Sequence, residues 1–169
     1  MSDSSSICLS CLQCCNGTLI GFVQLEREEI PALKGLLEIE EDSNGDGIFL
    51  QPCKNLCDTG CTIYEKRPKQ CAKFNCELLK SVEQKETDFD TAVEIINIVK
   101  QKRIDIEKRL ETLPLELKSE SFYFKMVELK KVLKKLESES ALTPNHLALI
   151  SDFEQLDILL PTKFGISSF

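Results

Sequence analysis

Apolar residues in the second half of the chain recur at every third or fourth position, a spacing that places them on one face of an α-helix. The first such segment covers residues 89–113, is interrupted only by Arg103, and is followed by Pro114, which ends a helix. A second segment covers residues 122–136 and follows two serines, either of which suits an N-cap. These stripes are typical of helices that pack around a core.

The third helical segment has the clearest boundaries. Thr143 suits the N-cap, Pro144 suits the first helical position, and we expect Pro161 to close the helix. Residues 81–169 are therefore predicted to form an α-helical region of about three helices. The one histidine of the chain, His146, falls in the first turn, and we expect it at the surface rather than at a metal.

The first half has a shorter and less regular pattern. Residues 1–7 are predicted to be a polar tail, residues 18–25 a short strand, and residues 26–39 a helix weakened by an internal proline and glycine. The sequence thus predicts a mainly α protein. A small irregular module of residues 1–80 precedes the helical region, which is expected to pack on it.

All nine cysteines lie in the first 76 residues. The first cluster is CLSCLQCC, residues 8–15, and the second covers residues 53–76. The candidate metal ligands are Cys8, Cys11, Cys14, Cys15, Cys53, Cys57, Cys61, Cys71 and Cys76.

The expected compartment favours metal binding by these thiols. Neither a basic n-region nor an apolar run of signal or membrane length opens the sequence, so we expect a cytoplasmic protein that contacts no membrane. Dense cysteine in a reducing compartment binds metal more often than it forms disulfides. Geometry agrees, because the Cα atoms of Cys14 and Cys15 are about 3.8 Å apart, whereas a disulfide needs roughly 4.4–6.8 Å.

The spacing of the first cluster suggests how the sulfurs are shared. Cys8, Cys11 and Cys14 follow a C-x2-C-x2-C pattern and suit one centre. Successive side chains in an extended segment point to opposite sides, so we hypothesise that Cys14 and Cys15 straddle two centres. Eight thiols make two four-sulfur sites, or one larger cluster with bridging sulfurs.

An all-sulfur ligand set suits structural zinc, our first expectation, or an iron–sulfur cluster, the alternative. The module has little core of its own, and a structural zinc contributes on the order of 10–16 kcal/mol to folding.

The charges limit the choice of partners. A formal net charge of −7 argues against nucleic acid as a partner. Basic residues around the second cluster either lower the thiol pKa values or are ordinary solvated side chains, and Arg67 is the best candidate for the electrostatic role. These residues are Lys54, Lys66, Arg67, Lys69 and Lys73.

With both clusters considered, the chain resembles the YkgJ-like CxxCxxCC family of zinc- or iron-chelating cysteine-cluster domains. The resemblance covers residues 8–76 and rests on CLSCLQCC and, more specifically, on CTIYEKRPKQC followed by KFNC. It implies metal ligation by every cysteine except Cys57. It also marks Tyr64, Arg67 and Pro68 as motif residues, and we expect Pro68 to fix the next turn and Tyr64 to pack over the cluster.

The chain departs from the family pattern at three positions. Leu12 stands where family members often have glycine, and Ala72 stands where they often have arginine. Cys57 is additional to the usual eight cysteines. Its C-x3-C spacings to Cys53 and Cys61 favour a ninth ligand, since nine thiolates can hold three metals by sharing sulfurs, and a free thiol is the alternative.

Three functions follow from these observations. The first is a metal-binding protein with a structural or metal-handling role, whose partners are metal ions and whose protein partner, if any, the sequence does not name. The second is an iron–sulfur redox component or cluster-dependent enzyme, since the resemblance extends to flagellin lysine N-methylases. The third is a metal store, which the ordered helical half disfavours. The sequence contains neither a glycine-rich nucleotide loop nor a Ser/His/Asp set.

Overall fold

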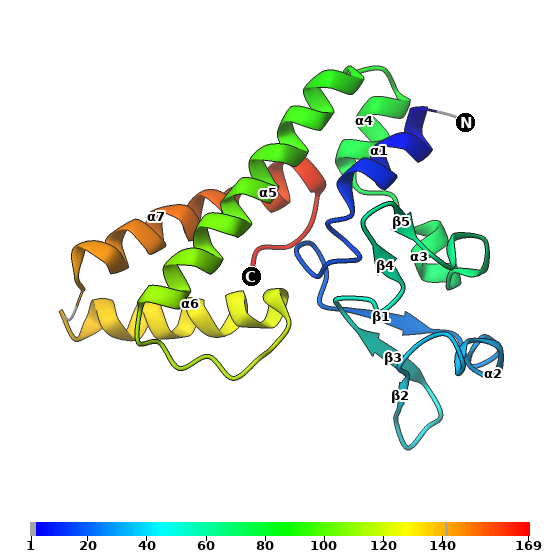
Figure 1. Ribbon diagram of the computed structural model, residues 1–169, viewed down its shortest axis with the longest axis horizontal. Coiled ribbons are helices and arrows are strands. Elements are labelled where there is room, and N and C mark those ends of the chain that lie inside the picture. Colours follow the sequence, from blue (N-terminus) through cyan, green and yellow to red (C-terminus); the bar gives the residue numbers. More distant parts are fainter. Residues whose placement is uncertain (1–2, 141) are drawn as a thin grey trace.

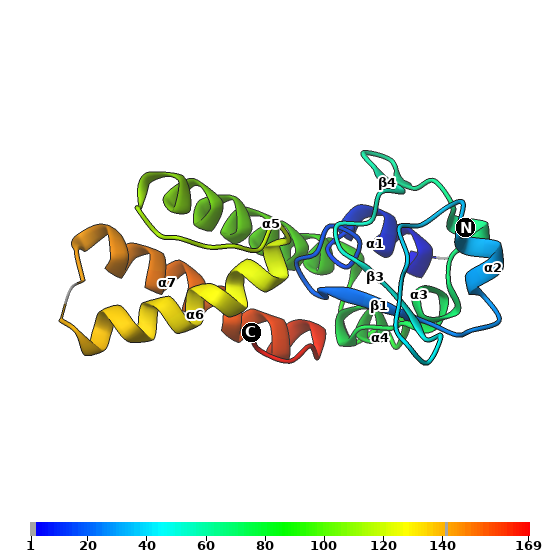
Figure 2. The ribbon, with the colours of Figure 1, turned by 90° about the horizontal axis from the view of Figure 1, so that it is seen from below.

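Two parts of unlike architecture lie side by side in the computed structural model, which describes residues 3–140 and 142–169 (Figure 1). A cysteine-rich part of short elements occupies one end, and long helices form an arm at the other, which is also clear in the perpendicular view of Figure 2. The prediction of a mainly α protein with an irregular first part is confirmed.

Three long helices make the arm, as the apolar spacing predicts. They are α5 (Phe89–Thr112), α6 (Phe122–Ser138) and α7 (Pro144–Leu159). The side chain of Asp88 caps α5 by accepting a hydrogen bond from the backbone N–H of Thr91 at 2.8 Å. Helix α7 packs against both α5 and α6. The buried positions match the predicted stripes and include Ala92, Ile96, Val99, Ile106, Met126, Leu129, Leu133, Leu149, Phe153 and Leu156.

The third helix does not close at Pro161, so this expectation is wrong. The chain continues through Pro161 as a π-helical turn, η2 (Leu160–Phe164), and stops at Gly165, whose φ of 65° is left-handed. Proline lacks only the N–H group and has a helical φ, so it is tolerated where a new turn begins. The extra turn buries Leu160 and Phe164.

His146 is not at the surface, contrary to the prediction. Its exposed fraction is 8%, and its Nδ1 accepts a hydrogen bond from the backbone N–H of Thr143 at 3.1 Å. The Thr143 side chain accepts in return from the His146 N–H. The histidine is therefore a capping residue of α7.

The cysteine-rich part contains two small antiparallel sheets. The first has the order β1-β3-β2 and pairs Phe22 with Leu50 and Leu25 with Gly47. The second is the hairpin β4-β5. The bounds are β1 (Phe22–Leu25), β2 (Glu40–Glu41), β3 (Gly47–Leu50), β4 (Leu56–Cys57) and β5 (Gly60–Cys61).

Short helices complete this part, and two expectations about them are corrected. Residues 1–7 were expected to be a tail, but helix α1 (Asp3–Cys11) already begins at Asp3. The helix expected over residues 26–39 is reduced to the single turn α2 (Ile30–Leu33), because turns occupy the residues on both sides. The remaining short helices are η1 (Tyr64–Lys66), α3 (Lys69–Lys73) and α4 (Glu77–Glu83).

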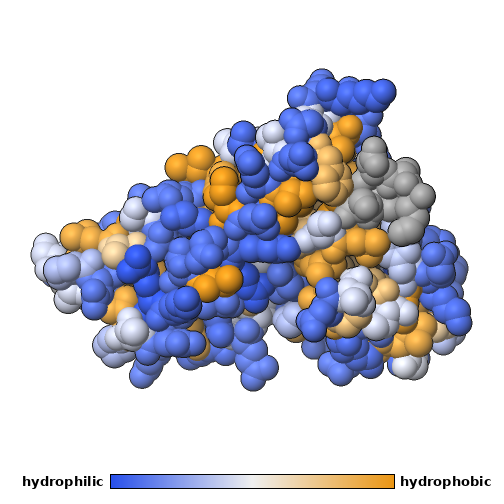
Figure 3. All heavy atoms as spheres, turned by 45° about the horizontal axis from the view of Figure 1, so that its top comes forward, coloured by the Kyte–Doolittle hydropathy of each residue, from blue (hydrophilic) through white to orange (hydrophobic). Residues whose placement is uncertain are grey.

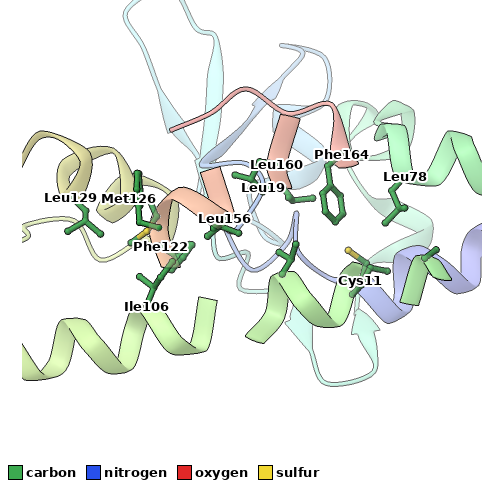
Figure 4. Packing of buried hydrophobic residues seen from close by; sticks show 14 of the residues in the cluster. Cys11, Leu19, Leu78, Ile106, Phe122, Met126, Leu129, Leu156, Leu160 and Phe164 are labelled. Carbon is green, nitrogen blue, oxygen red and sulfur yellow. The ribbon is translucent and has the colours of Figure 1, made fainter. Parts of the chain in front are cut away.

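Two hydrophobic clusters hold the molecule together. The larger one joins the buried faces of the long helices to Ile7, Cys11, Leu19 and Leu78 of the cysteine-rich part. Figure 4 shows Cys11 near Leu78 and Phe164 within this cluster. The smaller cluster lies between the first sheet and α2 and consists of Val23, Leu25, Ile30, Leu33, Leu37 and Phe49.

The outer surface of the arm is mostly hydrophilic, as Figure 3 shows for one face, with hydrophobic residues gathered towards the middle of the molecule. Within the described residues, none of the helices combines the length and the apolar character needed to span a bilayer.

A buried ion-pair network joins α5 to α7. Asp152 of α7 is 7% exposed and accepts hydrogen bonds from Lys102 and Arg109 of α5. Burial alone would raise the pKa of Asp152, but the bonds from the two cations outweigh it and hold this pKa below its usual value. A depressed pKa stabilises the fold above the unfolded-state pKa, and this stabilisation is lost as pH falls through the folded-state pKa.

We therefore predict that Asp152→Asn lowers the free energy of unfolding by about 1–3 kcal/mol at pH 7. The difference from wild type should narrow as pH falls below about 4, where the wild-type carboxylate also becomes neutral. Urea denaturation followed by circular dichroism measures both effects. Glu154→Gln, which neutralises an exposed carboxylate on the same helix, should change little. A difference independent of pH would contradict the assigned role of the Asp152 charge.

Candidate metal centre

Eight of the nine cysteines line one cavity of about 200 Å³ inside the cysteine-rich part. Apolar side chains, among them Leu19, Val23 and Phe49, form much of the remaining wall. The eight cysteines come from α1, the loop after it, the turn after β3, strand β5, helix α3 and the N-cap of α4. They are Cys8, Cys11, Cys14, Cys15, Cys53, Cys61, Cys71 and Cys76.

Helix α1 presents the first two of these thiols. Cys8 and Cys11 are three positions apart in the helix and therefore share one face. Cys11 is buried, whereas Cys8 is exposed at the edge of the site.

The loop after α1 carries the next two thiols and is closely hydrogen-bonded. The N–H groups of Thr18 and Leu19 both donate to the carbonyl of Gln13, and Gly17 N–H donates to Cys14 O. Gly17 has a φ of +80°, and a Cβ there would lie 3.3 Å from Cβ of Gln51, so the tight turn requires glycine.

One hydrogen bond joins the two sequence clusters. The backbone N–H of Cys53 donates to the carbonyl of Cys15 at 2.9 Å. The Asn55 side chain also donates to Leu36 O at 2.6 Å, which fixes the following turn beside the smaller hydrophobic cluster. The second cysteine cluster is thereby held against the loop of the first.

The surroundings of five thiols, together with the mutual charge effects among all eight, indicate two sets of four. Cys11, Cys14 and Cys76 pack in or against the larger hydrophobic cluster, whereas Cys53 and Cys71 pack against the smaller one. Mutual charge effects divide the thiols in the same way. One set is Cys8, Cys11, Cys14 and Cys76, and the other is Cys15, Cys53, Cys61 and Cys71.

The two sets meet at the adjacent pair of cysteines. Burial raises the pKa of Cys14 well above its ordinary value, and the strongest neighbouring effects on it come from Cys11 and Cys76. Burial raises the pKa of Cys15 to about 11, and there the strongest neighbours are Cys61 and Cys53. The effects of Cys15 on Cys14 and of Cys8 on Cys15 are smaller.

Residues 7–97 match the family model CxxCxxCC, described as "Putative zinc- or iron-chelating domain", and this range is more than half of the 169-residue chain. The chain belongs to the CxxCxxCC family. No curated protein and no solved structure gave a significant match to it.

Burial raises the pKa of seven cavity thiols of this CxxCxxCC protein, namely Cys8, Cys11, Cys14, Cys15, Cys53, Cys71 and Cys76. Burial raises the pKa of Cys11 and of Cys71 to about 12. Arg67 lowers the pKa of Cys15 and Cys71, as the sequence suggested, but burial outweighs it. The charge of Arg67 therefore acts in the direction of the electrostatic alternative, but it does not bring the pKa of Cys15 or Cys71 below the ordinary thiol value. A bound metal ion must displace protons from them at neutral pH.

Two other cations near the second cluster have a carboxylate partner outside it, whereas the charge of Lys54 acts to lower the pKa of Cys53 against the larger effect of burial. Lys69 forms an ion pair with Glu26 of the first sheet region, and Lys73 Nζ lies 4.0 Å from the same carboxylate. These lysines therefore attach α3 to β1 rather than neutralise the site.

The family motif residues between the cysteines also line the cavity. Tyr64 lies in η1, and the guanidinium carbon of Arg67 is 3.8 Å from the centroid of its ring. Pro68 is the N-cap residue of α3, which carries Cys71, so its fixed φ sets the direction of that helix.

Cys57 does not line this cavity. It lines a second, open groove together with Leu56, Asp58 and residues of α5, and Cys11 is the one cavity cysteine that also lines this groove. Its thiol donates to the carbonyl of Gly60 at 3.2 Å and lies 3.3 Å from the Thr59 hydroxyl. The Thr59 hydrogen bond lowers the pKa of Cys57, in contrast to the cavity thiols. Ligation by Cys57 stays a prediction that this arrangement does not support.

The cavity thiols line a common space without converging on one point. Across residues 7–140 and 142–169, whose side chains the structure describes, there is no group of three or more Cys, His, Asp or Glu side chains placed closely enough to hold a metal ion as they stand. Ligation would have to draw the sulfur atoms inwards.

Two features of the site lay outside the sequence-based predictions. Gln13 and Gln51 line the cavity at 1% and 2% exposure, and both Oε1 atoms lack a hydrogen-bond partner in the described part of the chain. Arg103 of α5 donates to Asn16 O and to the Thr18 hydroxyl. Its interruption of the apolar stripe was the available signal, whereas nothing in the sequence marks the glutamines.

Two family departures are now placed. Leu12 has a φ of 59°, in the left-handed region where glycine is unstrained, which accounts for the glycine common at this position. Ala72 is exposed on α3.

The Leu12 backbone gives a prediction that reverses the usual ranking of glycine and alanine. Leu12→Gly and Leu12→Ala both remove the side chain, but only glycine tolerates the positive φ without strain. We predict that Leu12→Gly is about 1 kcal/mol more stable than Leu12→Ala. Thermal or urea unfolding of the two variants measures the difference. The control pair is Leu9→Gly and Leu9→Ala in α1, where alanine should be the more stable. The same order at both positions would contradict a left-handed Leu12.

Proposed function

We propose that this CxxCxxCC protein binds two metal ions, zinc in the first instance, through two four-cysteine centres in one cavity. The first centre uses Cys8, Cys11, Cys14 and Cys76, and the second uses Cys15, Cys53, Cys61 and Cys71. The observation that carries the proposal is that these eight thiols alone, among the nine, line the cavity and divide into two sets at the Cys14–Cys15 pair.

The residues present fit such metals chemically. Thiolates are soft ligands that favour zinc and iron–sulfur clusters, and a four-thiolate shell is typical of structural sites. Burial raises the pKa of seven of the eight thiols, which disfavours an accumulation of repelling negative charges in the cavity before metal arrives. Because the sulfurs must move inwards on ligation, metal binding and final ordering of the site are coupled.

The proposed role is to hold the cysteine-rich part together. The first set packs against the larger hydrophobic cluster, so a metal there fixes α1 and α4 to the helical arm. The second set packs against the smaller cluster, so a metal there fixes the sheet region. Each metal thus cross-links segments that have few buried apolar residues. In a cytoplasmic setting the thiols stay reduced, and the same centres suit metal handling.

An iron–sulfur centre with a redox or enzymatic role is the second candidate. The apolar wall of the cavity favours this candidate, because the wall would shield an iron–sulfur cluster from water. All-cysteine sites accept either zinc or iron–sulfur, so the metal has to be measured.

Serine substitution tests the division into two centres. We predict that Cys71→Ser and Cys76→Ser each reduce the zinc content from two ions per chain to about one, because each removes a ligand from a different centre. Cys57→Ser should retain both ions. Metal analysis after gel filtration under reducing conditions gives the counts.

The alternatives give different counts. Loss of both metals in either single variant would indicate one cluster with shared sulfurs and contradict separate centres. Loss of a metal in Cys57→Ser would show a ninth ligand. His146→Ala is the control, because its side chain caps α7 and should leave the metal content unchanged.

Anaerobic purification distinguishes the two metals. We predict a colourless protein with two zinc ions, which remains free of cluster after anaerobic reconstitution with iron and sulfide. The visible absorption spectrum and the zinc, iron and acid-labile sulfide contents are measured on one sample. A brown protein with iron and sulfide in similar amounts would establish the second candidate instead.

A further inference from the structure

We infer that Arg103 of α5 is a positioning residue for the metal centre, acting from outside the family region through the loop that carries Cys14 and Cys15. The inference rests on the proposed function. The family match ends at residue 97, so the cysteine motif does not include this contact.

The carbonyl groups of this loop are hydrogen-bonded one after another. The carbonyl of Cys11 accepts a bond from the Gln13 side chain, and that of Leu12 accepts from Asn16 N–H. The carbonyl of Gln13 accepts from the N–H groups of Thr18 and Leu19, and that of Cys14 accepts from Gly17 N–H. That of Cys15 accepts from Cys53 N–H. The next carbonyl, that of Asn16, accepts from Nη1 of Arg103 at 2.8 Å. Arg103 therefore supplies the bond that fixes the residue directly after Cys15.

A second bond from the same nitrogen reaches the far side of the turn. Nη1 of Arg103 donates to the Thr18 hydroxyl at 2.9 Å. That hydroxyl in turn donates to the Asn16 side-chain oxygen at 2.7 Å. Thr18 is fully buried, so these bonds are shielded from water.

The guanidinium is itself held in place. Its Nε and Nη2 both contact Glu107 Oε1 at 3.1 Å, and its central carbon lies 4.6 Å from the centroid of the Phe122 ring. The side chain is 21% exposed. It thus connects α5, the start of α6 and the cysteine loop, and its rigid fork can direct several bonds at once.

A second cation of α5 reaches the other side of the cysteine motif. Lys100, one turn before Arg103, donates from Nζ to the carbonyl of Ser10 at 2.7 Å. Helix α5 therefore contacts the backbone both before Cys11 and after Cys15. Groups that orient metal ligands without touching the metal typically change metal affinity 10–100-fold when removed.

The test uses Co²⁺ as the probe, added to metal-free, reduced full-length protein and followed by absorption. Arg103→Met should weaken Co²⁺ binding about tenfold and shift the ligand-field bands, because the Cys14–Cys15 loop loses its anchor. Arg103→Lys should restore part of the affinity. Arg109→Met is the matched control, because it removes another α5 cation, the one that pairs with Asp152 of α7. This variant should leave the Co²⁺ absorption bands and the Co²⁺ affinity unchanged.

A second variant keeps the inference testable if Arg103→Met does not fold. Thr18→Val removes the hydroxyl that Arg103 binds but leaves the bond from Arg103 to the Asn16 carbonyl, so it should shift the bands in the same direction by a smaller amount. The inference would be overturned if Arg103→Met bound Co²⁺ with the absorption bands and affinity of the wild type. If Arg103→Met does not fold, the same result in Thr18→Val would overturn it. Wild-type protein that takes up neither Co²⁺ nor Zn²⁺ would overturn the proposed function itself, and the inference with it.

Discussion

The structure depends on the gathering of eight thiols, most of them partly buried, around one small and largely apolar cavity. Their segments extend from Cys8 to Cys76 and contain few long elements, so the cavity is a region where the chain has little other cause to stay ordered. Burial raises the pKa of Cys11 and of Cys71 to about 12, so these two thiols carry protons at neutral pH. A metal ion that replaces those protons forms metal–sulfur bonds, and the free energy of metal binding then contributes to the folding of the cysteine-rich part.

The two hydrophobic clusters give each of the two proposed metal centres a different part of the structure to stabilise. The first cluster belongs mainly to the helical arm and reaches the cysteine-rich part through Cys11 and Leu78. The second belongs to a three-stranded sheet and one helical turn, which is too small to be stable alone. In the proposed arrangement, a ligand set on each cluster, joined at Cys14–Cys15, ties the small cluster to the large one.

The sequence predicted the parts that depend on periodicity and local chemistry. Apolar spacing located α5, α6 and α7, and Thr143 marked the start of the last. It failed where tertiary contacts decide, since Pro161 sits within a continued turn and His146 is buried as a cap. Cysteine spacing selected all the cavity thiols, but it also included Cys57, because a C-x3-C pattern does not say which way a hairpin residue faces.

The Arg103 contact lay outside the sequence-based predictions, and the reason is physical. Arg103 interrupts an otherwise apolar stripe, and a sequence pattern can register the interruption but not the partner, which lies 85 residues away at Thr18. Thermodynamic linkage is reciprocal: if Arg103 strengthens metal binding by ordering the loop, then the bound metal strengthens the attachment of α5 to that loop by the same factor. The helical arm beyond the family region is then not an independent appendage. It shares in the stabilisation that the metals give to the cysteine-rich part.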